Sequence, residues 1–211
     1  MQIPAPTLLI NAGGTSRRMG TPKALLPTPG GEPLIRHIAH RLLPLAGELL
    51  VVANDPAVAD ALSPLPVRWL VDVYPDAGPL GGLATGLAVC DGWALCVACD
   101  LPFVQPALVR LLISLCSDEW DAVVPRVDGR AQPLHALYHR RCLPAVEAAL
   151  QTGRRRMDTF FPAVRVRWVE EEAMRPHDKE LRSFVNVNTP EEWAAAQQVA
   201  RGNFPAGDDV L

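Results

Sequence analysis

Glycine and basic residues are concentrated in INAGGTSRRMGTPK, which runs from Ile10 to Lys23 directly after an apolar run. Glycines let backbone N–H groups approach an anion closely, and arginine and lysine neutralise its charge. An apolar strand followed by such a loop is a sensible arrangement for binding phosphate. We therefore predict a phosphate-binding loop here, with Gly13 and Gly14 in its backbone and Arg18 and Lys23 as its cations.

Two familiar phosphate loops do not fit this stretch. A Walker A loop has four residues between its glycines and a lysine directly after the second, whereas five residues separate Gly14 from Gly20 and Thr-Pro precedes Lys23. The G-x-G-x-x-G fingerprint of dinucleotide-binding folds is absent from GGTSRRMG. The spacing therefore supports neither kinase-like hydrolysis nor hydride transfer.

Two acidic residues follow apolar runs further along the chain. Asp72 ends VRWLVD, and Asp100 ends ALCVACD. In open α/β sheets the ligand crevice lies at the carboxyl ends of the strands, and carboxylates there, with substrate phosphates, are typical ligands of Mg²⁺. Asp100 is thus a candidate metal ligand. The alternative is that it caps a helix beginning at Leu101.

The elements that must position these residues alternate along the chain. Six apolar runs have the pattern of buried strands: TLLIN, ELLVVAN, VRWLVD, ALCVACD, DAVVP and VRVRWV. Helical patterns lie between them, beginning at Pro33, Val104 and Arg140, and a last one begins at Asn188. This alternation predicts an α/β fold with a mostly parallel sheet. In the helix from Pro33, we expect His37 and His40 to face solvent rather than to bind a metal.

Composition limits the class of protein. The chain has 211 residues and a formal charge of -3, so we expect one domain over residues 1–200, a loose tail over 201–211 and no nucleic-acid partner. The apolar segments are too short and too rich in glycine to span a membrane. An odd number of cysteines, five, favours a reducing compartment, and we expect a cytoplasmic protein. The C-x-x-C of Cys96 and Cys99 lies in a strand, where the two thiols point to opposite faces.

Several segments in a fixed order carry a resemblance to a known family. The loop follows the nucleotidyltransferase signature L-x-G-G-x-x-x-R-M-G-x-x-K, with Asn11 in place of the leucine two residues before the first glycine. After it come VDVYPDAGPLGGL, CDLPF, QPLHALYHR, GRRRM and FVNVNTPEEW. Between about Leu8 and Trp193 the chain resembles the MobA family, the molybdenum cofactor guanylyltransferases. The resemblance implies a three-layer, Rossmann-like nucleotidyltransferase fold with a mostly parallel twisted sheet and helices on both faces.

The resemblance also implies roles for particular residues. The catalytic residues would be Arg18, Lys23 and Asp100, with Asp100 holding Mg²⁺. The nucleotide would be bound by Asn11, Ala12, Gly13, Gly14, Lys23, Asp72 and Asp100. The second substrate would be bound by Gly78, Pro79, Leu80, Gly81, Arg155, Arg156, Asn186 and Asn188.

Some of these residues have simpler interpretations. GPLGG, from Gly78 to Gly82, could be a plain turn, and the arginine run from Arg154 to Arg156 could be solvated surface. Asn186 and Asn188 alternate along an extended segment and share one face, yet Asn188 could simply begin the last helix. We assign no role to Asn54 at the end of ELLVVAN.

The activity implied is transfer of GMP from GTP to the terminal phosphate of molybdopterin, with release of pyrophosphate. Gly13 favours guanine, because cytidine-transferring relatives tend toward Ala-Ala-Gly, whereas Asn11 departs from the family pattern. Two alternatives stay open at this point: a nucleotidyltransferase that uses CTP or a sugar-phosphate acceptor, and a carrier of molybdenum cofactor without catalysis. The resemblance further implies transient contact with molybdoenzymes or other cofactor-biosynthesis proteins, and the sequence leaves the oligomeric state open.

Overall fold

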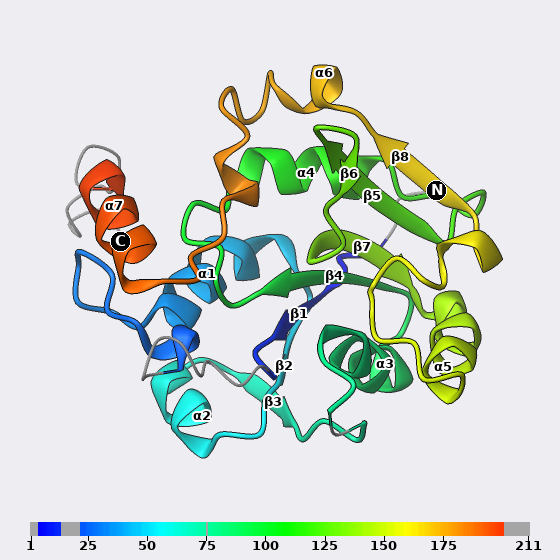
Figure 1. Cartoon of the computed structure of the whole chain (residues 1–211), viewed down its shortest axis with the longest axis horizontal. Helices are drawn as coiled ribbons and strands as arrows, with labels where there is room; N and C mark the ends of the chain where they lie inside the picture. The colour runs from blue at the N-terminus through cyan, green and yellow to red at the C-terminus, as the bar shows by residue number, and fades with distance from the viewer. Residues whose placement is uncertain (1–3, 14–21, 75, 201–211) are drawn as a thin grey trace.

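A twisted sheet runs through the middle of the molecule and is covered by helices on both faces (Figure 1). The structure is a computed structural model that describes residues 4–13, 22–74 and 76–200, and within these ranges eight strands form one sheet. The strands are β1 (Thr7–Asn11), β2 (Glu48–Val52), β3 (Val67–Leu70), β4 (Trp93–Ala98), β5 (Ala122–Val127), β6 (Arg130–Ala131), β7 (His135–His139) and β8 (Val166–Val169). The tail expected over residues 201–211 lies outside the described residues.

Helices connect most of these strands. The α-helices are α1 (Leu34–Leu42), α2 (Pro56–Leu62), α3 (Pro79–Val89), α4 (Pro106–Ser114), α5 (Leu143–Gln151), α6 (Glu171–Met174) and α7 (Pro190–Ala200). Short 3-10 helices are η1 (Lys23–Leu25), η2 (Leu43–Leu45), η3 (Arg140–Cys142), η4 (Phe161–Ala163) and η5 (Arg182–Phe184). None of the helices in the described part of the chain is long and apolar enough to cross a bilayer.

The order of the strands confirms the predicted fold class. The sheet runs β3-β2-β1-β4-β7-β5-β6, and β8 pairs with β5. β1, β2, β3 and β4 are parallel to one another, whereas β7 is antiparallel to both β4 and β5. The chain moves outward from β1 to β3 and then returns to β4 on the other side of β1. This reversal leaves a crevice beyond the carboxyl ends of β1 and β4.

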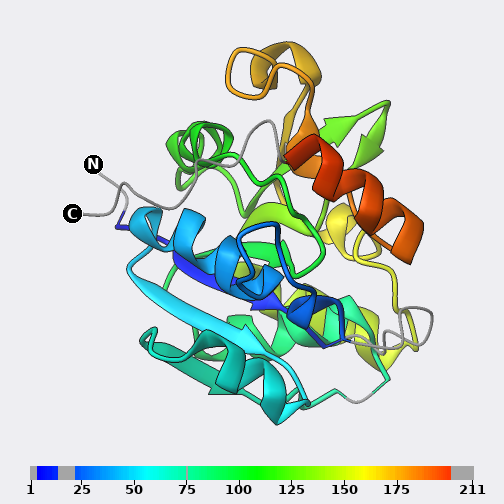
Figure 2. The same cartoon turned by 90° about the vertical axis from the view of Figure 1, so that its left-hand side faces the viewer.

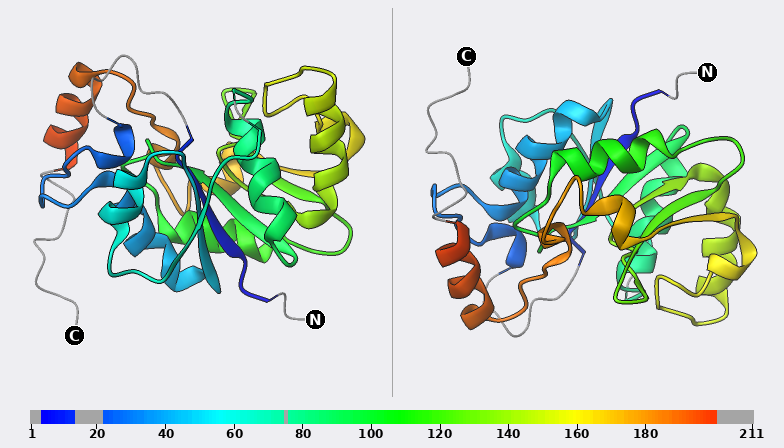
Figure 3. Two further views of the ribbon diagram at one scale, coloured as in Figure 1. Left: turned by 90° about the horizontal axis from the view of Figure 1, so that it is seen from below. Right: turned by 90° about the horizontal axis from the view of Figure 1, so that it is seen from above.

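The core consists of two apolar layers, one on each face of the sheet, because the side chains of the buried strands alternate between the two faces. Leu8 and Ile10 point to one face and Leu9 to the other, because successive side chains of a strand point in opposite directions. On the first face α1, α2 and α4 cover the sheet, and on the second α3 and α5 do so. The two views of Figure 3 show α3 and α5 together on one side and α1 and α4 on the other.

All six predicted strands are present, but β6 and β7 were not predicted. β5 and β6 form a hairpin whose two turn residues, Asp128 and Gly129, have φ of 49° and 70°. Asp-Gly between extended segments is a strong hairpin signal, because both positions of a type I′ turn need positive φ. This turn reverses the chain and makes β7 antiparallel.

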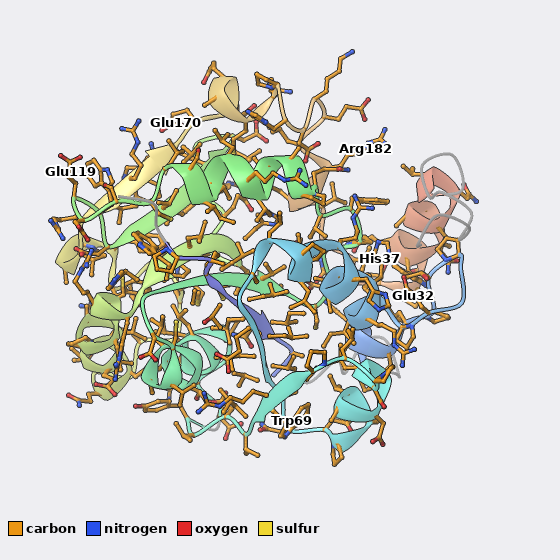
Figure 4. The ribbon with its side chains drawn as sticks, turned by 180° about the vertical axis from the view of Figure 1, so that it is seen from behind. Glu32, His37, Trp69, Glu119, Glu170 and Arg182 are labelled. Carbon is orange, nitrogen blue, oxygen red and sulfur yellow. The ribbon has the colours of Figure 1, made fainter. Side chains whose placement is uncertain are left out.

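The orientation expected for His37 was wrong. Its side chain is buried, and its Nδ1 lies 3.0 Å from Oε1 of Glu32; Figure 4 shows the two labelled residues side by side. The loop before α1 folds back so that the Glu32 carboxylate reaches both His37 and His40, the latter at 3.1 Å. Burial lowers the pKa of His37. The helix predicted from Pro33 is present as α1. His37 is buried because the loop that carries Glu32 lies over the outer face of this helix.

His135 makes stability depend on pH. It is 1% exposed, neither ring nitrogen has a hydrogen-bond partner among the described residues, and burial lowers its pKa to about 4. An unfolded chain therefore binds more protons at this side chain between pH 6.5 and 4, so the folded state loses stability as the pH falls through that window. The loss should reach about 3 kcal/mol.

We expect His135→Leu to flatten this pH dependence in urea unfolding curves measured from pH 7.5 to 4. The exposed residue His177 is the matched control, and His177→Gln should keep the slope of the unaltered protein. Parallel curves for His135→Leu and the unaltered protein would contradict the assignment.

Candidate active site

A cavity of about 440 Å³ lies at the carboxyl ends of the parallel strands. Loops that follow β1, β2, β3 and β4 all contribute to it, as expected where parallel strands end at one edge of a sheet. Nine residues that the sequence suggested for the site line it: Asn11, Ala12, Gly13, Lys23, Asp72, Gly78, Pro79, Asp100 and Asn186.

Lys23 and Asp100 form an ion pair in this cavity. Nζ of Lys23, in the first turn of η1, donates to Oδ2 of Asp100 at 2.9 Å and to Oδ1 of Asn188 at 2.7 Å. Asp100 lies two residues after the end of β4. The backbone carbonyl of Asp100 accepts a hydrogen bond from the Val187 N–H at 3.1 Å. Three segments that are far apart in the sequence therefore meet at one lysine. Figure 2 shows the η1 region and the segment that leads into α7 near the same edge of the sheet.

The second carboxylate oxygen of Asp100 is unsatisfied within the described part of the chain. Oδ1 is buried, and no described group donates a hydrogen bond to it. A buried acceptor without a donor is costly, and in native sites such an atom commonly faces an ion or a ligand. Around this atom the described residues form no cluster of three or more His, Cys, Asp or Glu side chains that could enclose a metal. A metal at Asp100 would therefore complete its ligands from other oxygen atoms, such as those of a substrate or of water.

Asp72 is held in place by the backbone and side chains around it. Its Oδ1 accepts hydrogen bonds from the Tyr74 N–H at 2.9 Å and from the Thr85 hydroxyl at 3.1 Å. Its own N–H donates to Oδ1 of Asn54 at 3.2 Å. Asn54, which had no predicted role, and Asp76 also line the cavity. The position of Asn54 after β2 was the available signal, because each of the other parallel strands, β1, β3 and β4, is followed by a cavity residue.

Asn11 connects the loop after β1 to helix α3. Its Nδ2 donates to the Pro79 carbonyl at 2.8 Å, and its Oδ1 accepts a longer bond from the Gly13 N–H at 3.4 Å. The side chain is 8% exposed and lies directly over Gly82, where a Cβ would meet Asn11 Nδ2 at 2.4 Å. The departure from the family pattern at Asn11 is therefore accommodated by hydrogen bonds within the fold.

The GPLGG segment is not a plain turn. Gly78, with φ of 62°, lies at the N-cap of α3, Pro79 occupies its first turn, and the helix continues through Gly81 and Gly82. Leu80 and Gly81 are buried and do not line the cavity, whereas Gly78 and Pro79 do. Glycines made this helix hard to predict, because they weaken helix propensity by about 1 kcal/mol each.

The remaining predicted residues are more scattered. Arg155 and Arg156 are exposed after α5 and do not line the cavity, and Arg156 pairs with Asp158 at 2.7 Å. Asn188 contacts Lys23 and also begins the turn before α7, where its N–H donates to Glu192 at 2.6 Å. Gly14 and Arg18 lie outside the described residues.

The thiol of Cys99 lines the cavity but is unsuited to be a nucleophile. Burial, with a smaller contribution from the Asp100 carboxylate, raises its pKa to about 12. The thiol is therefore protonated at neutral pH, and the thiolate is the reactive form. Cys96 is fully buried on the opposite face of the sheet, so the C-x-x-C pattern brings no two sulfurs together.

Comparison with known proteins gives consistent matches over most of the chain. The family model described as MobA-like NTP transferase domain matches residues 8–166. The probable molybdenum cofactor guanylyltransferase of Pelotomaculum thermopropionicum is 36% identical over 198 residues, covering 93% of this chain and 94% of the relative.

Two solved structures share the fold. Molybdopterin-guanine dinucleotide biosynthesis protein A from Archaeoglobus fulgidus superposes with a TM-score of 0.78 at 27% identity, covering 93% of this chain and 99% of that one. The 2-C-methyl-D-erythritol 4-phosphate cytidylyltransferase of Thermus thermophilus gives a TM-score of 0.65 at 22% identity, covering 93% and 98%. The second likeness concerns the fold alone.

Two glycines in the cavity region should respond differently to the same substitution. In Gly82→Ala the new methyl would collide with Asn11 at 2.4 Å, so we expect a loss of about 1–2 kcal/mol of unfolding free energy despite the better helix propensity of alanine. In Gly13→Ala the methyl would meet Asn11, Asp72 and Val52 at 3.7–3.9 Å, which is ordinary contact, and stability should change by less than about 0.5 kcal/mol.

Urea unfolding of the two variants tests this difference. Equal stability of Gly82→Ala and the unaltered protein would show that α3 can move away from β1. A large loss in Gly13→Ala would show instead that the fold, rather than a ligand, requires this glycine.

Proposed function

This chain belongs to the MobA-like NTP transferase family, and from that membership we propose that it transfers GMP from GTP to the terminal phosphate of molybdopterin. The products are pyrophosphate and a molybdopterin guanine dinucleotide. The observation that carries the proposal is the pairing of Lys23 with Asp100 in a cavity at the carboxyl ends of parallel strands. The names of the relatives supply the choice of guanine and of the acceptor.

The cavity suits a polyphosphate. The Lys23 ammonium would neutralise charge on the triphosphate, and the backbone of Ala12 and Gly13 can approach it closely because Gly13 has no side chain. We place Arg18 beside Lys23 on the triphosphate, from the signature in the sequence. We assign Asn186 and Asn188, with Arg155 and Arg156, to the acceptor.

Mg²⁺ fits the donors that are present. Oδ1 of Asp100 is a buried carboxylate oxygen without a hydrogen-bond donor among the described residues, and Mg²⁺ is commonly held by one or two carboxylates together with substrate phosphates. Asp100 would hold the ion. When bound, the ion would neutralise charge on the phosphate oxygens.

The reaction needs positioning more than covalent catalysis. An oxygen of the acceptor phosphate forms a bond to the α-phosphorus of GTP, and the bond between the α-phosphorus and the bridging oxygen to the β-phosphate breaks. Pyrophosphate leaves with the electron pair of that bond. Because the acceptor phosphate is already ionised, no general base is required, and the protein supplies orientation and positive charge.

We also propose a cytoplasmic location. All five cysteines are free thiols, four of them buried, as is usual in a reducing compartment. Transient contact with molybdoenzymes or other cofactor-biosynthesis proteins would then deliver the product.

Removal of either charged partner should abolish most turnover. We expect Lys23→Ala and Asp100→Ala each to lower GTP-dependent pyrophosphate release by a factor of about 100 or more, with an unchanged circular dichroism spectrum. The controls are Lys179→Ala and Asp118→Ala, which alter exposed side chains of the same types. Near-normal turnover in both site variants would contradict the assignment.

The choice of base can be measured separately. In a binding assay we expect GTP to compete at least about tenfold better than CTP or UTP. Preference for CTP or UTP would contradict the guanylyl assignment and support a related nucleotidyltransferase. Binding of molybdopterin without magnesium-dependent pyrophosphate release from any nucleotide would instead indicate a carrier.

A further inference from the structure

Asp72 lies in the loop between β3 and α3, and the apolar residues directly on either side of it are not packed into the core. Val71 and Val73, which flank Asp72, are 61% and 66% exposed. β3 is also the edge strand of the sheet, and Figure 4 shows its Trp69 at the rim of the molecule. Hydrophobic burial therefore does not determine where the Asp72 carboxylate points. Polar contacts must do so.

One side chain makes two of these contacts. The hydroxyl of Thr85 donates to Oδ1 of Asp72 at 3.1 Å and accepts from the Val73 N–H at 3.2 Å. It thus holds both the carboxylate and the backbone of the next residue. The Tyr74 N–H supplies a second donor to the same oxygen at 2.9 Å.

Thr85 is unusual in its surroundings. It is 5% exposed in the middle of α3, where the other buried residues are leucine, alanine and glycine. A buried threonine within a helix commonly bonds back to a carbonyl of its own preceding turn. The single hydroxyl proton of Thr85 is instead directed to Asp72, on another segment. The hydroxyl of Thr85 therefore serves the loop that carries Asp72 and Val73, and it makes no hydrogen bond that helix α3 itself needs.

The hydrogen bonds from the described residues leave one carboxylate oxygen of Asp72 for a ligand. Oδ1 of Asp72 is occupied by Thr85 and Tyr74, whereas Oδ2 lies on the side of Gly13, 3.8 Å from the place of a Cβ on that glycine. Both Asp72 and Gly13 line the cavity. With one oxygen fixed, the other is directed toward the loop that we assign to the nucleotide.

We propose that Thr85 is a positioning residue for nucleotide recognition. It orients Asp72 so that Oδ2 accepts a hydrogen bond from an O–H or N–H of the nucleoside, without itself touching the ligand. This proposal rests on the proposed function of the cavity. A carboxylate that must find its orientation on binding loses affinity, so the effect of Thr85 should appear in nucleotide binding and not in the chemical step.

Three variants separate positioning from packing. Thr85→Val keeps the shape and removes both hydrogen bonds, and we expect KM and Kd for GTP to rise about tenfold, with kcat within about threefold of the unaltered protein. Thr85→Ser keeps the hydroxyl and should restore both constants to within about twofold. Thr28→Val is the matched control, since Thr28 is also buried and its hydroxyl donates to the Glu32 carbonyl, away from the cavity.

Three outcomes would overturn the proposal. One is an unchanged KM in Thr85→Val, and another is an equal defect in Thr85→Ser, which would indicate a packing role. The third concerns coupling: in the double variant with Asp72→Ala, Thr85→Val should add little further loss, because the residue that it positions is gone. Full additivity of the two effects would therefore count against positioning.

Hydrogen exchange in the absence of nucleotide tests the contact independently of the function. The Val73 amide should be protected in the unaltered protein and in Thr85→Ser, and should exchange at least about tenfold faster in Thr85→Val. If no nucleotide binds to the unaltered protein, the proposed function fails, and the Val73 amide still reports whether Thr85 holds the loop. Equal exchange in all three proteins would overturn the role of Thr85 even if GTP binds.

Discussion

The close approach of helix α3 to strand β1 is the constraint on which the site depends. At Gly82 and Gly86 any Cβ would lie 2.4 Å from Asn11 or Leu9, so only glycine permits this separation. The approach brings the start of α3 within hydrogen-bond reach of Asn11 and places Thr85 beneath Asp72. Two loops that contribute to the cavity are therefore positioned by one helix, whose glycines reduce its own helix propensity.

On the side of the cavity formed by Lys23 and Asp100, the charged groups are held by contacts between distant parts of the chain. Lys23 is held between Asp100 and Asn188, which come from distant parts of the chain. The pair of Lys23 and Asp100 is partly shielded from water, with side-chain exposures of 18% and 16%, so its interactions are stronger than those of a surface pair. The other carboxylate oxygen of Asp100 has no hydrogen-bond donor among the described residues. A negative group that could hold a cation therefore lies beside a lysine that could bind phosphate.

The fold does not by itself determine which base is bound. The same architecture occurs in a cytidylyltransferase at 22% identity, so the fold alone leaves the choice of base open. At Gly13 the protein leaves room for a methyl group, and the glycine is therefore not required by packing. Asn11, which departs from the family pattern, is turned into the fold and bonds Pro79.

Local patterns predicted the six strands and the cavity residues Gly13, Lys23, Asp72 and Asp100, whereas the resemblance to a known family supplied the other predicted cavity residues. Buried parallel strands are continuous apolar runs, and the residues after them must meet at one edge of the sheet. Tertiary structure decided what these patterns do not encode. Helix α3 forms despite its glycines because it packs on β1, and His37 is buried because the Glu32 loop covers it. The partners of Lys23 and Asp72 likewise arise from contacts between distant segments, which no local period in a sequence records.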